Sequence, residues 1–275
     1  RLVHPNVVTI HEAGEADGHV YIAEEFCAGG NLGEWLDRHP GPLPPRVAAR
    51  VVTALAGAVA HSHGFCILHR DIKPANVLLV PGDSGPLEGD GGRGRLDVKL
   101  ADFGLGKLSD PASEAAASDL TRAGSRLGTP AWMAPEQIDA SFGPVGPATD
   151  IHALGLLLDR LLTGRCAHAG SDEAETMRLV LTAEAAPADR IVRGVPADLG
   201  AVTAKCLAKR PVDRYATVAD LAGDLARFLD GRPTVARPVT TLGRVVRFAR
   251  RHRGLDRKST RLNSSHANIS YAVFC

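Results

Sequence analysis

The chain has 275 residues, of which 44% are hydrophobic and 23% are charged, and its formal net charge is +1. These values are ordinary for a soluble globular protein, and the length is enough to bury one substantial core. The five cysteines form an odd set without a C-x-x-C pair, which argues against a disulfide framework and favours reduced thiols in a cytosol. The 11 histidines lack the spacing of metal ligands, which argues against a zinc site.

The first 64 residues predict one strand and two helices. Residues 20–27 read as a strand, and residues 31–36 open a helix. A second helix follows Pro44-Pro45, because apolar residues recur at every fourth position, and it ends at the C-cap signal His63-Gly64. The recurring apolar residues are Val47, Val51, Leu55 and Val59.

The middle and end of the chain predict a hairpin and two further helices. Residues 77–79 form a short strand, and its partner is 96–101, where apolar and polar residues alternate. The Gly-, Asp- and Pro-rich stretch 81–95 is expected to be a variable, mobile insertion without chemistry. Residues 151–162 are apolar on most sides and predict a buried helix that is too short to span a bilayer. A last helix begins at a capping-box-like segment and ends at a glycine, over 217–231.

The octet 69–76, H-R-D-I-K-P-A-N, places a carboxylate, an ammonium and a carboxamide on one short loop, at Asp71, Lys73 and Asn76. Phosphoryl transfer needs a group that orients a hydroxyl, a cation for the migrating phosphoryl, and an oxygen ligand for Mg²⁺. Downstream, Asp102-Phe103-Gly104 follows the second strand of the predicted hairpin. Alone, this tripeptide would predict only a turn after a strand. Because the octet precedes it, we interpret Asp102 as a second carboxylate that faces a metal ion.

Three more segments follow in order: G-T-P-A-W-M-A-P-E at 128–136, D-I-H-A-L-G at 150–155 and K-R-P-V-D-R-Y at 209–215. Together with the octet and the Asp-Phe-Gly tripeptide they resemble the motifs of protein kinases, with the Lys placed as in the Ser/Thr branch. The sequences of these motifs are most similar to those of bacterial Ser/Thr kinases of the eukaryotic-like type. The resemblance covers roughly residues 1–231.

The resemblance implies an α+β, protein-kinase-like fold with a mostly helical large lobe and only a remnant of the β-rich small lobe. It divides the chain into a small-lobe remnant with hinge at 1–30, a large lobe at 31–231, a basic segment at 232–257 and a non-native, adapter-derived tail at 258–275. The implied activity is transfer of the ATP γ-phosphoryl to protein Ser/Thr hydroxyls, with ATP and Mg²⁺ as cofactors. The expected partners are therefore ATP and a protein substrate, and no nucleic acid.

By resemblance, Asp71 orients the substrate hydroxyl and takes its proton, and Lys73 neutralises charge on the γ-phosphoryl. Asp102 is expected to bind the Mg²⁺ that bridges the ATP phosphates, and Asn76 is expected to hold a second Mg²⁺.

The resemblance also implies an adenine site at the hinge. Glu25 and Cys27 offer backbone groups to adenine, and Leu78 forms the floor beneath it. Glu24 occupies the gatekeeper position, and a charged residue there departs from the usual apolar one.

Regulation is implied by Arg70, which lies beside the catalytic aspartate and is expected to pair with a phosphate in the activation segment. Thr121 or Ser125 is the expected phosphosite. Thr129 is expected instead to bond Asp71 and Lys73 and to help set the Ser/Thr preference.

Two structural roles follow from the resemblance. Glu136 and Arg214 are expected to form a partly buried ion pair, and Asp150 begins the long buried helix that anchors the large lobe. Trp132 replaces the tyrosine usual in this family, one large flat ring for another.

The chain begins without Met, at residues that resemble a turn inside the small lobe, so we expect a piece of a longer gene product. No G-x-G-x-x-G precedes the catalytic loop, and the strand Lys and helix Glu that clamp ATP have no counterpart here. Residues 1–275 alone are therefore expected to bind ATP weakly and turn over slowly. The alternatives are a pseudokinase-like docking or signalling module, which predicts a damaged catalytic set, and a small-molecule kinase, which predicts no segment like 128–136.

Residues 237–258 carry eight basic residues and one acidic residue, with apolar residues interleaved at helical spacing. This pattern favours either a juxtamembrane basic helix on the cytoplasmic side of a membrane or a solvated basic linker. The expected location is cytoplasmic, with the longer protein anchored to a membrane in the first case.

Overall fold

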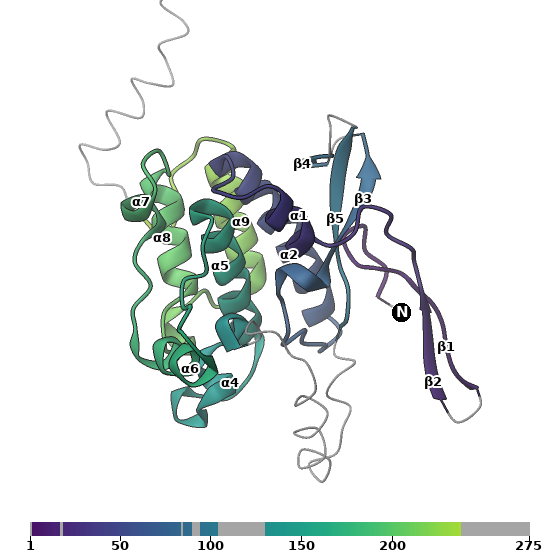
Figure 1. The fold of residues 1–275 in the computed structure, drawn as a ribbon. Helices are drawn as coiled ribbons and strands as arrows, with labels where there is room; N and C mark the ends of the chain where they lie inside the picture. The colour runs from purple at the N-terminus through teal and green to yellow at the C-terminus, as the bar shows by residue number, and fades with distance from the viewer. Residues whose placement is uncertain (1, 17–18, 84, 90–93, 104–129, 238–275) are drawn as a thin grey trace, which may run out of the picture. The chain divides into compact units, whose positions relative to one another are not determined.

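Two small antiparallel sheets and a body of helices make up the part of the chain that the computed structural model describes (Figure 1). The described residues are 2–16, 19–83, 85–89, 94–103 and 130–237. All of them belong to one unit, which ends at Arg237.

The first sheet is a hairpin of β1 (Ile10–Ala16) and β2 (His19–Glu24). The strand predicted at 20–27 is confirmed as far as Glu24. Just before the hairpin, the backbone exchanges hydrogen bonds with Leu100: the Leu100 N–H donates to the Asn6 carbonyl at 2.8 Å, and the Val8 N–H donates to the Leu100 carbonyl at 3.0 Å. The N-terminal segment is thus tied to the strand that leads to the expected metal ligand Asp102.

The second sheet has the order β3-β5-β4. The predicted hairpin is confirmed: β3 (Val77–Gly82) pairs antiparallel with β5 (Arg95–Leu100) over its whole length. The prediction of an unstructured insertion over 81–95 is wrong at β4 (Leu87–Glu88), which pairs with β5. The physical reason is that Leu87 is almost completely buried in the core, and a single apolar residue in a polar stretch gives no periodic signal.

Four helices form the centre of the helical body: α2 (Pro45–His63), α5 (Pro147–Thr163), α8 (Ala197–Cys206) and α9 (Val218–Leu229). Helix α2 packs against α5 and α9, and α8 packs against α5 and α9 (Figure 1). Helix α5 is buried nearly all round, as predicted from residues 151–162, which are apolar on most sides.

The predicted caps are present, with one difference in geometry. Helix α9 begins at a capping box in which Thr217 and Asp220 exchange side-chain-to-backbone hydrogen bonds. Helix α2 ends at His63 as predicted, but its C-cap Gly64 is right-handed, with φ of −60°. The left-handed residue that turns the chain is Cys66, with φ of 60°, two residues further on.

The remaining elements are short and lie around this centre. They are α1 (Leu32–Arg38), η1 (Pro74–Asn76), η3 (Pro130–Trp132), α4 (Pro135–Ile138), η4 (Ala140–Phe142), α6 (Glu173–Thr182), α7 (Ala188–Ile191) and η5 (Pro211–Asp213). Across the described ranges, no helix is both long and apolar enough to cross a membrane.

Asp159 of α5 gives the fold a pH dependence. Its carboxyl group is buried, and neither carboxyl oxygen has a hydrogen-bond partner among the described residues. Burial raises its pKa to about 6, although nearby Arg165 and the Thr163 hydroxyl, which is close but outside hydrogen-bonding geometry, oppose the rise. Because the folded chain holds this proton more tightly than the unfolded chain, the group's contribution to stability falls as pH rises from about 4 to 6.

We therefore expect Asp159→Asn to be more stable, relative to the unsubstituted chain, at pH 7 than at pH 4. The expected difference is about 1–3 kcal/mol, since each unit of pKa shift corresponds to about 1.4 kcal/mol. Urea unfolding at both pH values measures it, and Asp213→Asn, at an exposed aspartate, should leave the profile unchanged. Parallel pH profiles for Asp159→Asn and the unsubstituted chain would contradict the assignment.

Candidate active site

The catalytic loop, residues 69–76, is held in place by hydrogen bonds to Asp150, which lies near the start of α5. The Asp150 side chain is completely buried and accepts hydrogen bonds from the main-chain N–H groups of His69 at 3.0 Å and Arg70 at 2.7 Å. Its Oδ2 also lies 2.7 Å from His63 Nε2 at the end of α2. Asp150 is expected to begin the helix that anchors the large lobe. Its side chain also binds the catalytic loop directly.

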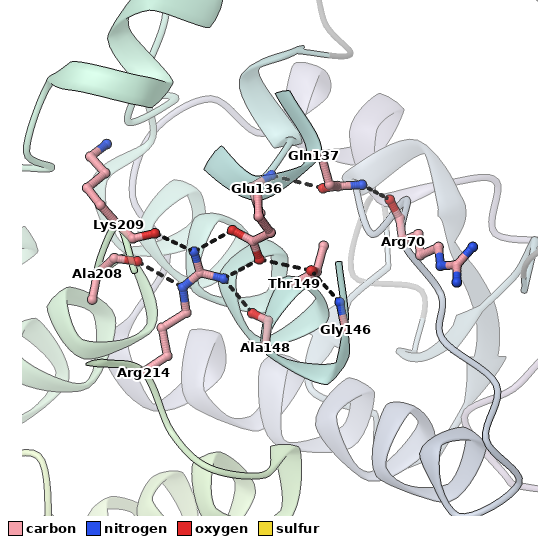
Figure 2. A network of polar contacts seen from close by, with 10 residues as sticks. Arg70, Glu136, Gln137, Gly146, Ala148, Thr149, Ala208, Lys209 and Arg214 are labelled. Atoms are coloured by element: carbon pink, nitrogen blue, oxygen red, sulfur yellow. Dashed lines mark hydrogen bonds and ion pairs between the residues drawn. The ribbon is translucent and has the colours of Figure 1, made fainter. Parts of the chain in front are cut away.

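These bonds hold a strained backbone. Arg70 has φ of 66°, a left-handed conformation that costs a non-glycine residue about 1–3 kcal/mol. The Gln137 side chain in α4 donates to the Arg70 carbonyl at 2.8 Å, so both sides of the strained residue are held. The Arg70 side chain is exposed and points away from this network (Figure 2).

His69 connects the two segments that carry the expected catalytic and metal-binding carboxylates. Its Nε2 lies 2.8 Å from the Ala101 carbonyl, which can only accept, so Nε2 carries the proton. Burial lowers the pKa of His69, and the neutral ring leaves Nδ1 free to accept the Asp71 N–H at 3.3 Å. One buried imidazole thus sets the spacing between Asp71 and the residue before Asp102.

Asp71, Lys73 and Asn76 converge on one point, as the octet predicts. Lys73 Nζ lies 2.8 Å from Asp71 Oδ2, and Asn76 Nδ2 donates to the same oxygen at 3.0 Å. Asn76 Nδ2 also donates to the Asp71 main-chain carbonyl at 2.8 Å. The carboxylate side chain of Asp71 is 47% exposed, so it is oriented by its neighbours and still open to an incoming hydroxyl.

The two expected metal ligands are neighbours. The Ala101 N–H donates to the Asn76 carbonyl at 2.9 Å, which places Asn76 beside the exposed Asp102. The Asn76 Nδ2 is committed to Asp71, so its amide oxygen remains to bind a cation. An amide oxygen and a carboxylate are the hard donors that Mg²⁺ prefers, and few protein ligands are needed by Mg²⁺ ions that also bind phosphates.

The hinge side of the site matches the expected adenine position in part. The Glu25 N–H donates to the Thr9 carbonyl at 2.8 Å, so only the Glu25 carbonyl could serve adenine. Its side chain is held by Lys99 Nζ at 2.7 Å, and that hydrogen bond lowers the pKa of the Glu25 carboxyl. Cys27 follows on the hinge, and Leu78 on β3 is half-buried on the face opposite the buried Val77 and Leu79.

A cavity of about 390 Å³ lies beside Asp102, between the N-terminal segment and the end of β5. Glu24, at the expected gatekeeper position, lies on its wall. Val8, Leu100, Asp102 and Phe103 also line it. The walls are mainly apolar and carry the three carboxylates of Glu12, Glu24 and Asp102. Mainly apolar walls with a few polar groups suit a small-molecule site.

Glu136 and Arg214 form a completely buried ion pair, deeper than the sequence suggested (Figure 2). The contact is bidentate, with Nη1 to Oε1 at 2.6 Å and Nη2 to Oε2 at 2.8 Å. The other guanidinium N–H groups donate to main-chain carbonyls of Ala148, Ala208 and Lys209. Thr149 Oγ1 donates to Glu136 at 2.9 Å, which ties the pair to the start of α5.

Several residues of the site were not singled out from the sequence. His63, His69 and Gln137 help to position the catalytic loop through contacts that join distant parts of the chain. Thr149 instead supports the Glu136–Arg214 pair. The expected regulatory residues Thr121, Ser125 and Thr129 lie outside the described residues.

Asp150→Asn tests the anchoring of the loop. An amide presents N–H groups where Asp150 now accepts, so a backbone N–H loses its partner, and we expect a loss of about 1–3 kcal/mol in the free energy of unfolding. Phosphoryl transfer should fall as well, because Arg70 and Asp71 lose their fixed position. Urea unfolding measures the first effect, and Asp139→Asn is the control, since that carboxylate is exposed and accepts from one main-chain group, at Ser141. Equal stability of both variants would argue against the role of Asp150.

Comparison with known proteins shows the family of the chain. Residues 1–223 match the protein kinase domain family. The chain is 34% identical over 229 residues to the serine/threonine-protein kinase PrkC of Bacillus subtilis, covering 83% of this chain and 32% of that protein. It is 32% identical over 225 residues to PknL of Mycobacterium tuberculosis, covering 82% of this chain and 51% of that protein. The chain thus spans about a third of the length of PrkC and about half of the length of PknL.

A solved structure shows the same fold. The crystal structure of a point mutant of the Mycobacterium tuberculosis PknI kinase domain matches with a TM-score of 0.57 at 26% identity, covering 82% of this chain and 72% of that one. The α+β kinase-like fold inferred from the sequence is therefore confirmed. By this family match, these relatives and this fold, the chain belongs to the protein kinase family, in the bacterial eukaryotic-like Ser/Thr branch.

Proposed function

We propose that this chain is the catalytic part of an ATP-dependent Ser/Thr protein kinase. The observation that carries the proposal is the convergence of Lys73 and Asn76 on one oxygen of Asp71, with Asp102 beside Asn76. An oriented carboxylate, a cation and two oxygen ligands are what phosphoryl transfer requires of a protein.

In the proposed reaction, the substrate hydroxyl donates a hydrogen bond to Asp71. The hydroxyl oxygen bonds to the γ-phosphorus, the bond between that phosphorus and the β,γ-bridging oxygen breaks, ADP leaves, and the proton passes to Asp71. Lys73 offsets the charge on the transferred group, and Asn76 and Asp102 would hold Mg²⁺. When bound, Mg²⁺ would neutralise negative charge on the phosphates.

Regulation by activation-segment phosphorylation is part of the proposal. Arg70 is exposed beside Asp71, and its guanidinium has no ion-pair partner among the described residues. A phosphate on Thr121 or Ser125 would supply one. The proposed setting is the cytoplasm, and the basic segment 237–258 would favour the anionic surface of a membrane.

The intact set Asp71, Lys73, Asn76 and Asp102 favours an enzyme over a pseudokinase-like docking or signalling module. Residues 1–275 carry no G-x-G-x-x-G before the catalytic loop, so we expect these residues alone to work slowly.

The test is incubation with γ-labelled ATP, Mg²⁺ and a mixture of protein substrates, followed by phosphoamino-acid analysis. We expect slow labelling of serine and threonine that chelation of Mg²⁺ or Asp102→Asn abolishes. MgATP binding without any transfer over long incubation would favour the docking module, and labelling that survives chelation would reject the assigned metal ligands.

A further inference from the structure

A second cleft, of about 390 Å³, opens on the other side of the catalytic loop. It lies between that loop, α1, η3 and the end of α5. The lining residues that matter for its chemistry are Asp37, Lys73, Ala75, Trp132, Arg160 and Cys166.

The cleft adjoins the proposed catalytic carboxylate through Lys73. That side chain lines the cleft and at the same time pairs with Asp71 Oδ2 at 2.8 Å. A protein segment whose hydroxyl meets Asp71 would therefore pass along the cleft, advancing about 3.3 Å per residue if extended. Residues close in sequence to the acceptor would place their side chains in it.

The charge that the cleft offers to such a side chain comes from Arg160. Lys73 is already paired with Asp71. Arg160 donates from Nη1 to the Gly164 carbonyl, and within the described part of the chain it forms no ion pair. Since a guanidinium has five N–H donors, most remain for a ligand.

Asp37 on α1 carries the opposite charge but is placed to act more weakly. It is exposed, whereas Arg160 is half-buried. A charge in a less solvated position interacts more strongly at the same distance. Carboxylates and phosphates are the groups that a guanidinium binds best, because two N–H groups can match two oxygens.

We propose that Arg160 is a specificity-determining residue, which selects protein substrates with an anionic side chain near the acceptor serine or threonine. The anion is the carboxylate of Asp or Glu, or the phosphate of an already phosphorylated residue. This inference rests on the proposed kinase function.

The test measures binding of fluorescent serine peptides to residues 1–275, with one Asp moved through each position on either side of the serine. Matched series carry Lys or phosphoserine instead of Asp, and the phosphoserine series separates the two sources of negative charge. At one or more positions we expect the anionic peptide to bind about tenfold more tightly than the Lys peptide. Arg160→Glu should reverse this preference, and Arg160→Lys should keep most of it.

Arg160 also donates to the Gly164 carbonyl, so its substitution could disturb the fold. Two further variants therefore test the proposal without changing Arg160. Asp37→Arg adds a positive charge without touching Arg160 and should strengthen binding of the anionic peptides. Arg190→Glu, at an exposed arginine of α7 outside the cleft, should change nothing. Thermal unfolding of each variant checks that it is folded.

The outcomes separate the two proposals when the same peptides are also assayed for phosphoryl transfer. Equal transfer to anionic and basic peptides would overturn the role of Arg160 and leave the kinase function standing. Charge-selective binding through Arg160 with no transfer to any peptide would overturn the kinase function, and the substrate selection with it.

Discussion

Asp71→Asn is expected to lower phosphoryl transfer by about 10²- to 10⁴-fold while MgATP binding stays nearly unchanged. The amide has the shape of the carboxylate, so Asn76 and Lys73 can stay close to their present positions. It carries no negative charge and cannot take the hydroxyl proton. The proposed Mg²⁺ ligands Asn76 and Asp102 are untouched, and for this reason binding should survive.

The measurement pairs a single-turnover transfer assay with calorimetric titration of MgATP. Asp213→Asn, at an exposed aspartate of η5, is the matched control and should retain both properties. A variant that loses binding and transfer to the same extent would show that Asp71 holds the nucleotide, which is a different role from the one assigned here.

The residues closest to the chemistry could be predicted because they lie close together in the sequence. Asp71, Lys73 and Asn76 fall within one short loop, so the order of the residues nearly fixes which groups meet. The predicted β3–β5 hairpin then brings Asp102 to the same place, since Ala101 bonds directly to Asn76. Short sequence separations leave few arrangements of the backbone open.

The supporting contacts could not be predicted, because each joins segments that only the folded chain brings together. His63 meets Asp150 across 87 positions, and Glu25 meets Lys99 across 74. Arg160 belongs to the same class: α5 reads as a continuous buried helix, and nothing in its sequence shows that one face borders a cleft beside Lys73. The periodicity of apolar residues indicates that a helix is buried, but it does not indicate which part of the protein each face of the helix contacts.

Removal of the Arg214 side chain is expected to lower the free energy of unfolding by about 3–5 kcal/mol. Glu136 would keep its charge in a completely buried position, and among the described residues only Thr149 would be left to donate to it. The five guanidinium donors now serve Glu136 and three main-chain carbonyls, so those carbonyls lose their partner as well. Arg214→Lys should also be costly, because an ammonium cannot reproduce the bidentate contact.

An exposed ion pair with a similar nitrogen-to-oxygen distance supplies the control. Arg232 Nη2 lies 2.8 Å from Asp230 Oδ2, but both side chains are about half exposed. Solvent screens that contact, so Arg232→Ala should cost no more than about 1 kcal/mol. Urea unfolding of Arg214→Ala, Glu136→Ala and the double variant completes the comparison. The double variant should cost less than the sum of the single ones, because no charge is then stranded. Strict additivity, or similar losses for Arg214→Ala and Arg232→Ala, would mean that burial does not set the strength of the Glu136–Arg214 pair.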